Sequence, residues 1–236
     1  MLEELYSWVG QDMLFIIFTL SIYAGASVVH RHLASHPLLH PLPIAIVCIA
    51  GTLKKIGISY ETYFQSVRFL HLLLGPAICL LAIPLYRQMG VLKRAPIAIL
   101  ISVTLGSVAA VLSALGILMA LGPIKISLLA SMAPKSVTTA VAMAIAERTG
   151  GVPALAAAFV ISSGIVGAVV APTLYAVIRV RDPLAMGLGI GTASHAIGTA
   201  RALQISEVMG AASALAMALN AILTAVILPV LWTMFL

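Results

Sequence analysis

Two short polar segments interrupt an otherwise apolar sequence, and their side chains could bind an anion. The first segment, Ser131–Thr139, places Pro134 directly before Lys135. Proline ends one helix and favours the start of another. The first turn of that new helix would offer free N–H groups and the positive end of its dipole, and Lys135 adds a full charge. The residues expected to bind the anion are Lys135, Ser136, Thr138 and Thr139, unless Lys135 instead reaches a membrane interface.

The second segment, Gly191–Arg201, carries an imidazole, a guanidinium and several hydroxyl groups. His195 could donate a hydrogen bond to a carboxylate or carry a coupled proton, because imidazole titrates near physiological pH. The alternative is a histidine with a purely structural role. Arg201 could clamp a carboxylate, or it could pair with an acidic residue elsewhere. The residues expected to bind a substrate here are Ser194, His195, Thr199 and Arg201.

Three further polar residues complete the candidates. Glu147 and Glu207 could pair with Arg201, or they could take part in proton coupling together with His195. Their alternative role is that of charges at helix ends near water. Asn220 is the strongly polar side chain of the last apolar run, and we expect it to contact the substrate or to link helices by hydrogen bonds.

Several classes of protein are excluded by the motifs and the charge pattern. The sequence contains no nucleophile elbow, P-loop or dinucleotide fingerprint, so neither an enzyme with catalytic residues nor a cofactor is expected. Pro37 and Pro41 separate the histidines between His30 and His40, and no metal site is expected there. The net charge is +6, but the basic residues are scattered rather than clustered, which excludes nucleic acid as a partner.

The composition places the chain in a lipid bilayer. Hydrophobic residues make up 62% of the 236 residues and charged residues 8%, whereas soluble domains carry about 25% charged residues. Mean hydropathy is +1.15. Five runs without Asp, Glu, Lys or Arg are long enough to cross a membrane as helices: Met13–Val29, Phe69–Tyr86, Ala95–Leu121, Val152–Ile178 and Val208–Leu236.

Three other apolar segments, Pro41–Leu53, Ile124–Ala146 and Leu184–Ala200, are short or broken. Broken helices occur at membrane depth only where they line a cavity or are buried in protein. Lysine and arginine are enriched in cytoplasmic loops. This rule places the basic loops at residues 30–32, 87–94 and 179–181 in the cytoplasm, and Ile124–Ala146 then becomes a re-entrant hairpin from the outer side.

A weak internal repeat links the two polar segments. When the sequence is shifted by 60 residues, Ser136–Phe159 and Ala196–Leu219 are identical at 10 of 24 positions. If both polar segments are re-entrant, the long spans that follow them run in opposite directions, which is the inverted repeat of secondary transporters. We therefore predict an all-α polytopic membrane helical bundle with broken helices. Residues 1–236 would form one transmembrane domain, with N-terminal helices over 1–123 and repeat-related units over 124–179 and 184–236.

The two polar segments also carry a resemblance to a known family. Pro134–Thr139 and Gly191–Arg201 resemble signature segments of the LrgB/CidB membrane proteins, as do Leu74–Ala77, Pro84–Tyr86 and Gly151–Pro153. The sequence departs from the family pattern at Ala140, where proline is common, and at His40, where asparagine is common. The resemblance implies a location in the cell inner membrane and, as a partner, a smaller LrgA/CidA-type membrane protein. It leaves a homo-oligomer open.

The resemblance implies two functional traditions. Bacterial members are described as holin-like or antiholin-like regulators of murein hydrolases and lysis. A related plastid protein is a glycolate/glycerate translocator, and some bacterial members are implicated in pyruvate transport. A holin-like protein needs only oligomerising helices, whereas charged residues at broken helices suit a binding site. We therefore expect a secondary transporter of small carboxylates, with a regulator of murein hydrolase export as the alternative.

Overall fold

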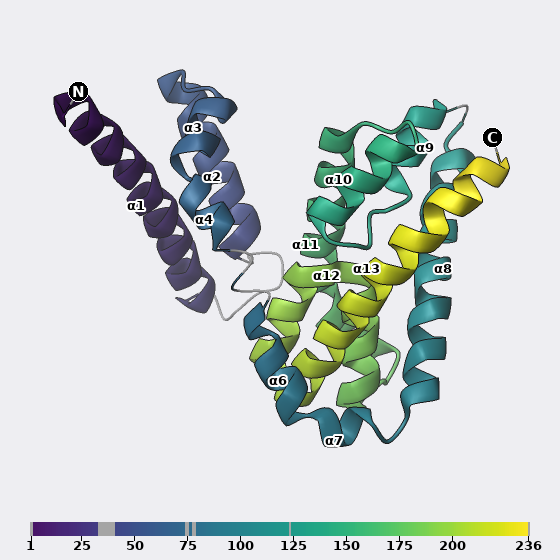
Figure 1. Ribbon diagram of the computed structural model, residues 1–236. Helices are drawn as coiled ribbons and strands as arrows, with labels where there is room; N and C mark the ends of the chain where they lie inside the picture. The colour runs from purple at the N-terminus through teal and green to yellow at the C-terminus, as the bar shows by residue number, and fades with distance from the viewer. Residues whose placement is uncertain (1, 33–40, 74–75, 77–78, 123, 236) are drawn as a thin grey trace. The chain divides into compact units, whose positions relative to one another are not determined.

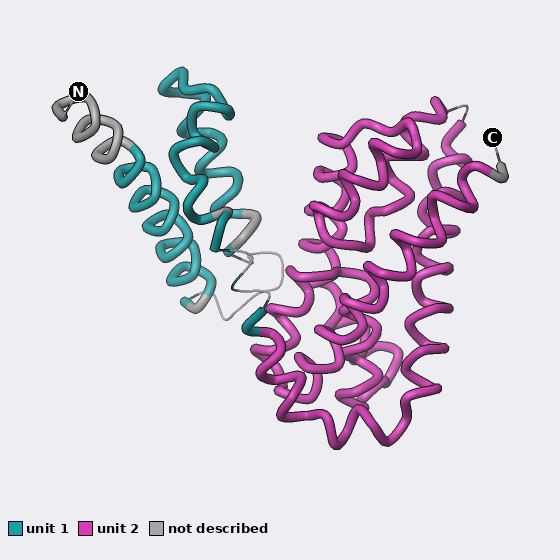
Figure 2. Tube along the Cα trace, viewed as in Figure 1, with its two compact units in different colours: residues 1–80 teal, residues 81–236 magenta. Residues whose placement is uncertain are grey.

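The computed structural model describes residues 2–32, 41–73, 76, 79–122 and 124–235. These residues form helices joined by turns, without a strand among them, which confirms the all-α prediction. The chain divides into two compact units, residues 1–80 and 81–236 (Figure 2). The candidate site lies in the second unit. The grouping of all residues into one transmembrane domain stays a prediction.

The first unit is built around one long apolar helix. Its helices are α1 (Leu2–His32), α2 (Pro41–Ile56), α3 (Tyr60–Ser66) and α4 (Arg68–Leu72). Thr19 on α1 is hydrogen bonded to the hydroxyl of Tyr63 on α3 at 2.9 Å, and the Phe15 ring meets the Tyr63 ring edge-on. Most side chains of the stretch Asp12–His30 are exposed, as expected for a helix that faces lipid.

The second unit holds the three other long apolar helices (Figure 1). Proline occupies the first turn of α8, α11 and α12, where its missing N–H has no helical partner to lose. The helices of this unit are α6 (Ala82–Arg87), α7 (Met89–Leu92), α8 (Pro96–Ala120), α9 (Ile126–Met132), α10 (Thr139–Arg148), α11 (Pro153–Val177), α12 (Pro183–Ile205) and α13 (Glu207–Phe235).

Within the described part of the chain, four helical stretches are long and apolar enough to cross a membrane: Asp12–His30, Pro96–Ala120, Pro153–Val177 and Glu207–Thr233. They confirm four of the five predicted spans. The fifth, Phe69–Tyr86, is not one long helix. Its described residues include α4 and α6 with turns at Leu73 and Leu81, and Pro76 lacks the N–H that an uninterrupted helix requires. Residues 74–75 and 77–78 lie outside the described part of the chain.

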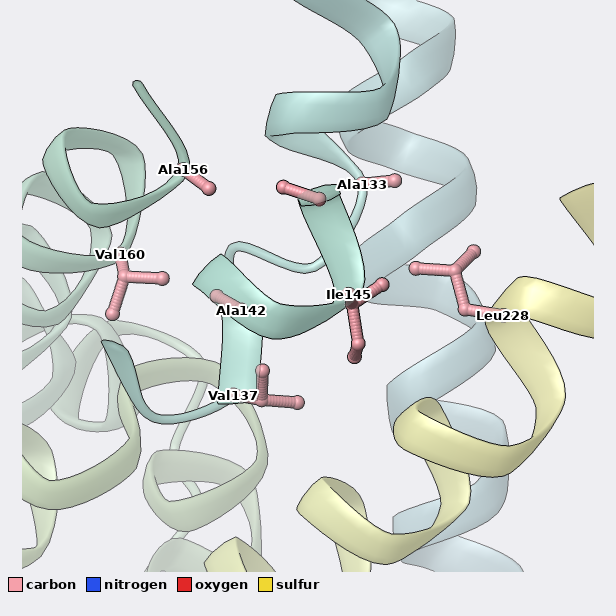
Figure 3. Close-up of a cluster of buried hydrophobic side chains, with 8 residues drawn as sticks. Ala133, Val137, Ala142, Ile145, Ala156, Val160 and Leu228 are labelled. Atoms are coloured by element: carbon pink, nitrogen blue, oxygen red, sulfur yellow. The ribbon is translucent and has the colours of Figure 1, made fainter. Parts of the chain in front are cut away.

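The long helices of the repeat run in opposite directions. One buried cluster joins Ala156 and Val160, near the start of α11, to Leu228, near the end of α13 (Figure 3). Another joins Ala171, in the later part of α11, to Met209 at the start of α13. The start of α11 and the end of α13 therefore lie at one end of the second unit, and the end of α11 and the start of α13 lie at the other. This antiparallel arrangement is the one that the predicted inverted repeat requires, and the repeat itself stays a prediction.

Two of the basic loops lie at the same end of the second unit. Lys93 and Arg94 precede α8, and Arg179 and Arg181 precede α12. Ile99 near the start of α8 and Leu188 near the start of α12 belong to one buried cluster, together with Leu92, Val103, Ala212 and Ala216. The predicted orientation requires both loops on one side of the membrane, and this geometry fulfils that requirement. That this side is the cytoplasm stays a prediction.

Candidate functional site

The first repeat is broken between α9 and α10, at the predicted proline. Helix α9 ends at Met132 and α10 begins at Thr139. Between them the backbone is held by turn hydrogen bonds, such as the one from the Lys135 N–H to the Met132 carbonyl at 3.1 Å. Thr138 has the extended backbone of an N-cap residue, although its side chain makes no capping bond. Pro134 also predicts a new helix that begins directly after it, with Ser136 in the first turn. This is wrong, because α10 begins at Thr139 and Ser136 lies within the break.

Lys135 and Ser136 are differently placed in this first break. Ser136 is fully buried, whereas Lys135 is half-buried. The Ser163 hydroxyl on α11 lies 2.9 Å from the carbonyl oxygen of Lys135. The ion pair recorded in the described part of the chain joins Arg87 to Glu207, so no carboxylate there neutralises Lys135. An anionic ligand could therefore take the place of a carboxylate partner beside the Lys135 amino group.

The second repeat is broken at a single residue inside α12. His195 has φ 40° and ψ −136°, a conformation that is strained for a residue with a side chain. The ring is buried, and its Nε2 lies 2.9 Å from the carbonyl oxygen of Val160 on α11. Because a carbonyl only accepts, Nε2 must carry the proton and Nδ1 is the free acceptor. Among the described residues, no hydrogen bond to Nδ1 is recorded.

Two glycines of α11 make room for this break. A Cβ on Gly164 would lie 2.6 Å from Cε1 of His195, and a Cβ on Gly167 would overlap the Ser194 hydroxyl. The α11 backbone therefore approaches the broken part of α12 closely. The polar Ser-Ser-Gly sequence at residues 162–164 was the available signal for this contact, and the sequence analysis missed Ser163 and Gly164.

The two breaks meet at Asn220 on α13. This side chain is fully buried. Its Nδ2 donates to the carbonyl of Ser136 in the first break at 2.9 Å and to the carbonyl of Thr192 in α12 at 3.0 Å. Its Oδ1 accepts from Ser107 on α8 at 2.5 Å and from Thr224 at 3.2 Å. Asn220 thus links both breaks and α8, and the described bonds use both of its amide atoms.

The crossing of the two breaks also follows the repeat. The shift of 60 residues that aligns the repeats places Lys135 on His195 and Val160 on Asn220. The second break bonds to Val160, and the first break bonds to Asn220. Each break therefore contacts the same position in the long helix of the other repeat.

The predicted hydroxyl residues of the second segment are buried beside the break. Thr199 donates to or accepts from Ser213 on α13 at 2.8 Å, and its hydroxyl also lies 2.8 Å from the His195 carbonyl oxygen. Ser194 packs against Gly198, where an added Cβ would lie 2.6 Å from the Cβ of Ser194. These contacts hold the second break in place. In the first segment, Thr138 and Thr139 are half-buried.

The hydrogen bonds and the ion pair described for the predicted charged residues do not involve Asn220 or either break. Arg201 donates to Gln204 at 3.1 Å. Glu207 lies 3.9 Å from Arg87, with about two thirds of its side chain exposed, and Gln88 donates to it at 3.4 Å. Glu147 is exposed. The described ion pairs contain no pairing of Arg201 with either glutamate. Both acids therefore have the positions of charges near helix ends, the alternative stated above.

Two surface hollows reach the residues around the crossing. The larger, of about 300 Å³, lies between α8 and α12 and includes Thr192, whose carbonyl binds Asn220. The smaller, of about 90 Å³, lies between α8 and α13 and includes Ser107 and Thr224. The lining of each hollow includes a hydrogen-bond partner of Asn220. The larger hollow is lined in part by glycine and alanine residues of α8 and α12, whose small side chains leave this space open.

The model of the LrgB-like family matches residues 19–234. The Bacillus subtilis (strain 168) protein named "Uncharacterized protein YwbG" is 34% identical over 209 residues, covering 89% of this chain and 92% of the relative. The "Antiholin-like protein LrgB" of Bacillus cereus (strain B4264) is 31% identical over 214 residues, covering 91% and 93%. No solved structure gives a significant match. The chain therefore belongs to the LrgB-like family, as a multi-pass protein of the cell membrane.

Proposed function

We propose that this protein is a secondary transporter of small carboxylates and that the crossing of the two breaks is its substrate site. The observation that supports this proposal is the meeting of two broken helices from antiparallel repeats around Asn220. Secondary transporters bind substrates near the midplane at such discontinuous helices. The helices of a protein that only oligomerises would not need to be broken.

The first break supplies the groups for a carboxylate. Lys135 offers an ammonium group without a carboxylate partner among the described residues. The start of α10, at Thr138 and Thr139, adds backbone N–H groups and the positive end of the helix dipole. Ser136 lies between these groups. Together they would bind the negative end of a glycolate, glycerate or pyruvate molecule, and Ser194 and Thr199 would contact the substrate hydroxyl groups from the second break.

His195 is the proton carrier in this proposal. Its Nε2–H is held by the Val160 carbonyl, so a proton would add at Nδ1. If the two side chains share one substrate, a second positive charge in that site would be favourable only when a carboxylate is bound, because like charges repel. Proton and substrate would therefore bind together and cross together. The exposed positions of Glu147 and Glu207 suit this coupled role less well.

The names of the Bacillus cereus relatives favour a second candidate. They are called antiholin-like, and a regulator of murein hydrolase export that works with an LrgA-type partner would fit that name. In such a protein the exposed apolar helices would be contact surfaces for other membrane helices. Lys135 and His195 would then have structural roles only.

The test is uptake of radiolabelled glycolate, glycerate, pyruvate and lactate into proteoliposomes, with and without a pH gradient. Saturable uptake that one unlabelled acid competes away, absent from empty liposomes, supports transport. Leakage of an unrelated dye without such uptake supports the holin-like candidate. If neither occurs, the assay is repeated with an LrgA-type protein in the same membrane, and a second absence of uptake contradicts the transport proposal.

A further inference from the structure

We propose that Asn220 is the positioning residue that holds the two breaks in register, so that Lys135 and His195 face one substrate. Its side chain is fully buried, and its Nδ2 donates to one carbonyl in each break region, those of Ser136 and Thr192. Ser136 is adjacent to Lys135 in the chain, and Thr192 lies three residues before His195. A single amide group thus fixes the backbone beside both proposed ligand-binding residues.

The orientation of this amide follows from its partners. Both backbone carbonyls can only accept, so the NH₂ group of Asn220 must face them. The hydroxyls of Ser107 and Thr224 then donate to Oδ1. The opposite orientation would place an amide oxygen against two carbonyl oxygens and leave both without a donor. The contacts therefore admit one arrangement, in which each proton of the NH₂ group bonds a different repeat.

The need for this amide arises from the breaks themselves. A carbonyl near the end of a helical segment loses its partner in the next turn, and a buried polar group without a partner is costly away from water. The Ser136 carbonyl lies inside the first break, and the Thr192 carbonyl lies in the last turn before the second. In a described core made largely of alanine, valine and leucine, Asn220 satisfies both.

The two repeats differ in the side chain at the position that bonds to the breaks. The position equivalent to Asn220 in the first repeat is Val160, which contributes only its carbonyl, as an acceptor for His195. In the described hydrogen bonds Val160 reaches only the second break, whereas Asn220 reaches the first break and the helical turn before the second. Loss of the Asn220 amide should release the two breaks together, and no other side chain in the described bonds has that property.

The first test uses hydrogen–deuterium exchange and does not depend on any substrate. In Asn220→Leu, which keeps the size but removes the bonds, peptides that cover residues 133–138 and peptides that cover residues 193–198 should both exchange about tenfold faster. Thr224→Val is the matched control, because it removes one bond to Oδ1 and leaves both links to the breaks. Faster exchange in only one break, or in neither, overturns the proposal.

A second variant guards against a folding failure of Asn220→Leu. Asn220→Asp keeps the shape and the acceptor but cannot donate two hydrogen bonds, so it should also release the breaks. Size-exclusion profile and helical content should match the wild-type protein. If Asn220→Asp is folded and both breaks keep wild-type exchange rates, the proposal is wrong.

The consequence for substrate binding rests on the proposed function. Loosened breaks would hold the binding geometry for a smaller fraction of the time, which raises the apparent Kd by the same factor. We expect the KM of the folded Asn220→Asp protein to be about tenfold higher than that of the wild-type protein. A merely structural role would lower the amount of active protein and leave KM unchanged, which contradicts the proposal. If the wild-type protein carries no carboxylate, the proposed function fails, while the exchange result still decides the role of Asn220.

Discussion

The two breaks that meet at Asn220 are built in different ways. The first spans residues 133–138, contains a proline and leaves Lys135 half-buried. The second is confined to His195, whose backbone is strained while the helix continues on both sides. The first break follows from its own residues, because proline cannot continue the helix. The second depends on its neighbours, since Gly164 makes room for the His195 ring and the Val160 carbonyl accepts a hydrogen bond from its Nε2.

This difference separates the roles that the breaks can play. A break caused by proline persists whatever α11 does, so the first break can present a fixed charge. A break held by contacts with α11 can change when those contacts change, so the second suits a residue whose protonation must vary. The predictions below test this division.

The largest effect is expected from removal of the fixed charge. Lys135→Ala should weaken carboxylate binding by about 100-fold or more, because a bound anion would lose its charged partner. Binding is measured by competition of unlabelled acid against radiolabelled substrate. The matched control is Lys125→Ala, an exposed lysine at the start of α9, which should bind as the wild-type protein does. Wild-type affinity in Lys135→Ala would remove the first break from the site.

The next effect tests the dependence of the second break on α11. In Gly164→Ala the new methyl group would lie 2.6 Å from the His195 ring, so the ring must leave the Val160 carbonyl. Overpacking of this kind costs about 1–3 kcal/mol, and we expect a lower Tm together with loss of most uptake. Gly116→Ala in α8 is the control, because nothing lies within 4 Å of its Cβ. It should raise Tm slightly, since alanine favours helices.

An unchanged Tm and unchanged uptake in Gly164→Ala would mean that the second break does not rest on α11. The contrast between the breaks would then be wrong. A lower Tm with normal uptake per folded molecule would keep the packing argument and remove His195 from transport.

The same contrast explains what could be predicted from the sequence. Apolar runs predict four spans correctly, since length and composition decide them, and Pro134 marks the first break because its effect is local. The polar segment around His195 indicates a second site of interest, but the residue that breaks the helix is set by packing against Gly164. The helix after Pro134 begins at Thr139, later than the sequence predicts, so Ser136 precedes its first turn.

The partners of Asn220 could not be predicted at all. Its polarity in an apolar helix indicates either a ligand contact or a link between helices. The choice of Ser136 and Thr192 as acceptors depends on how residues far apart in the sequence meet in space. Single-sequence patterns carry no such distances. The charged residues show the same limit, because Arg201 bonds to Gln204 rather than to a glutamate.

A smaller effect concerns proton coupling at the second break. In the wild-type protein, uptake should rise when the outer solution is made more acidic, because protonation of His195 adds a charge that attracts the substrate. His195→Gln keeps a donor for the Val160 carbonyl but cannot titrate. We expect it to retain uptake at a reduced rate and to lose the acceleration by a pH gradient. Acceleration equal to that of the wild-type protein would assign the proton to another group.

The smallest effect concerns Ser163, which lies between the two breaks. Its hydroxyl has one proton and two acceptors at 2.9 Å, the carbonyls of Lys135 and Val160. The Val160 carbonyl already accepts from His195, so we assign the proton to the Lys135 carbonyl. Loss of one such bond costs about 0.5–1.5 kcal/mol, and Ser163→Ala should therefore raise KM by about two- to tenfold.

The exposed neighbour Ser162 provides the control, because Ser162→Ala changes the same helix without a recorded bond to either break. Its KM should equal that of the wild-type protein. A higher KM in Ser163→Ala alone would show that α11 supports the first break through Lys135 as well as the second through His195. An unchanged KM would mean that the Ser163 hydroxyl donates to the Val160 carbonyl instead. The first break would then be held by its own proline and by Asn220, which sharpens the contrast between the two breaks.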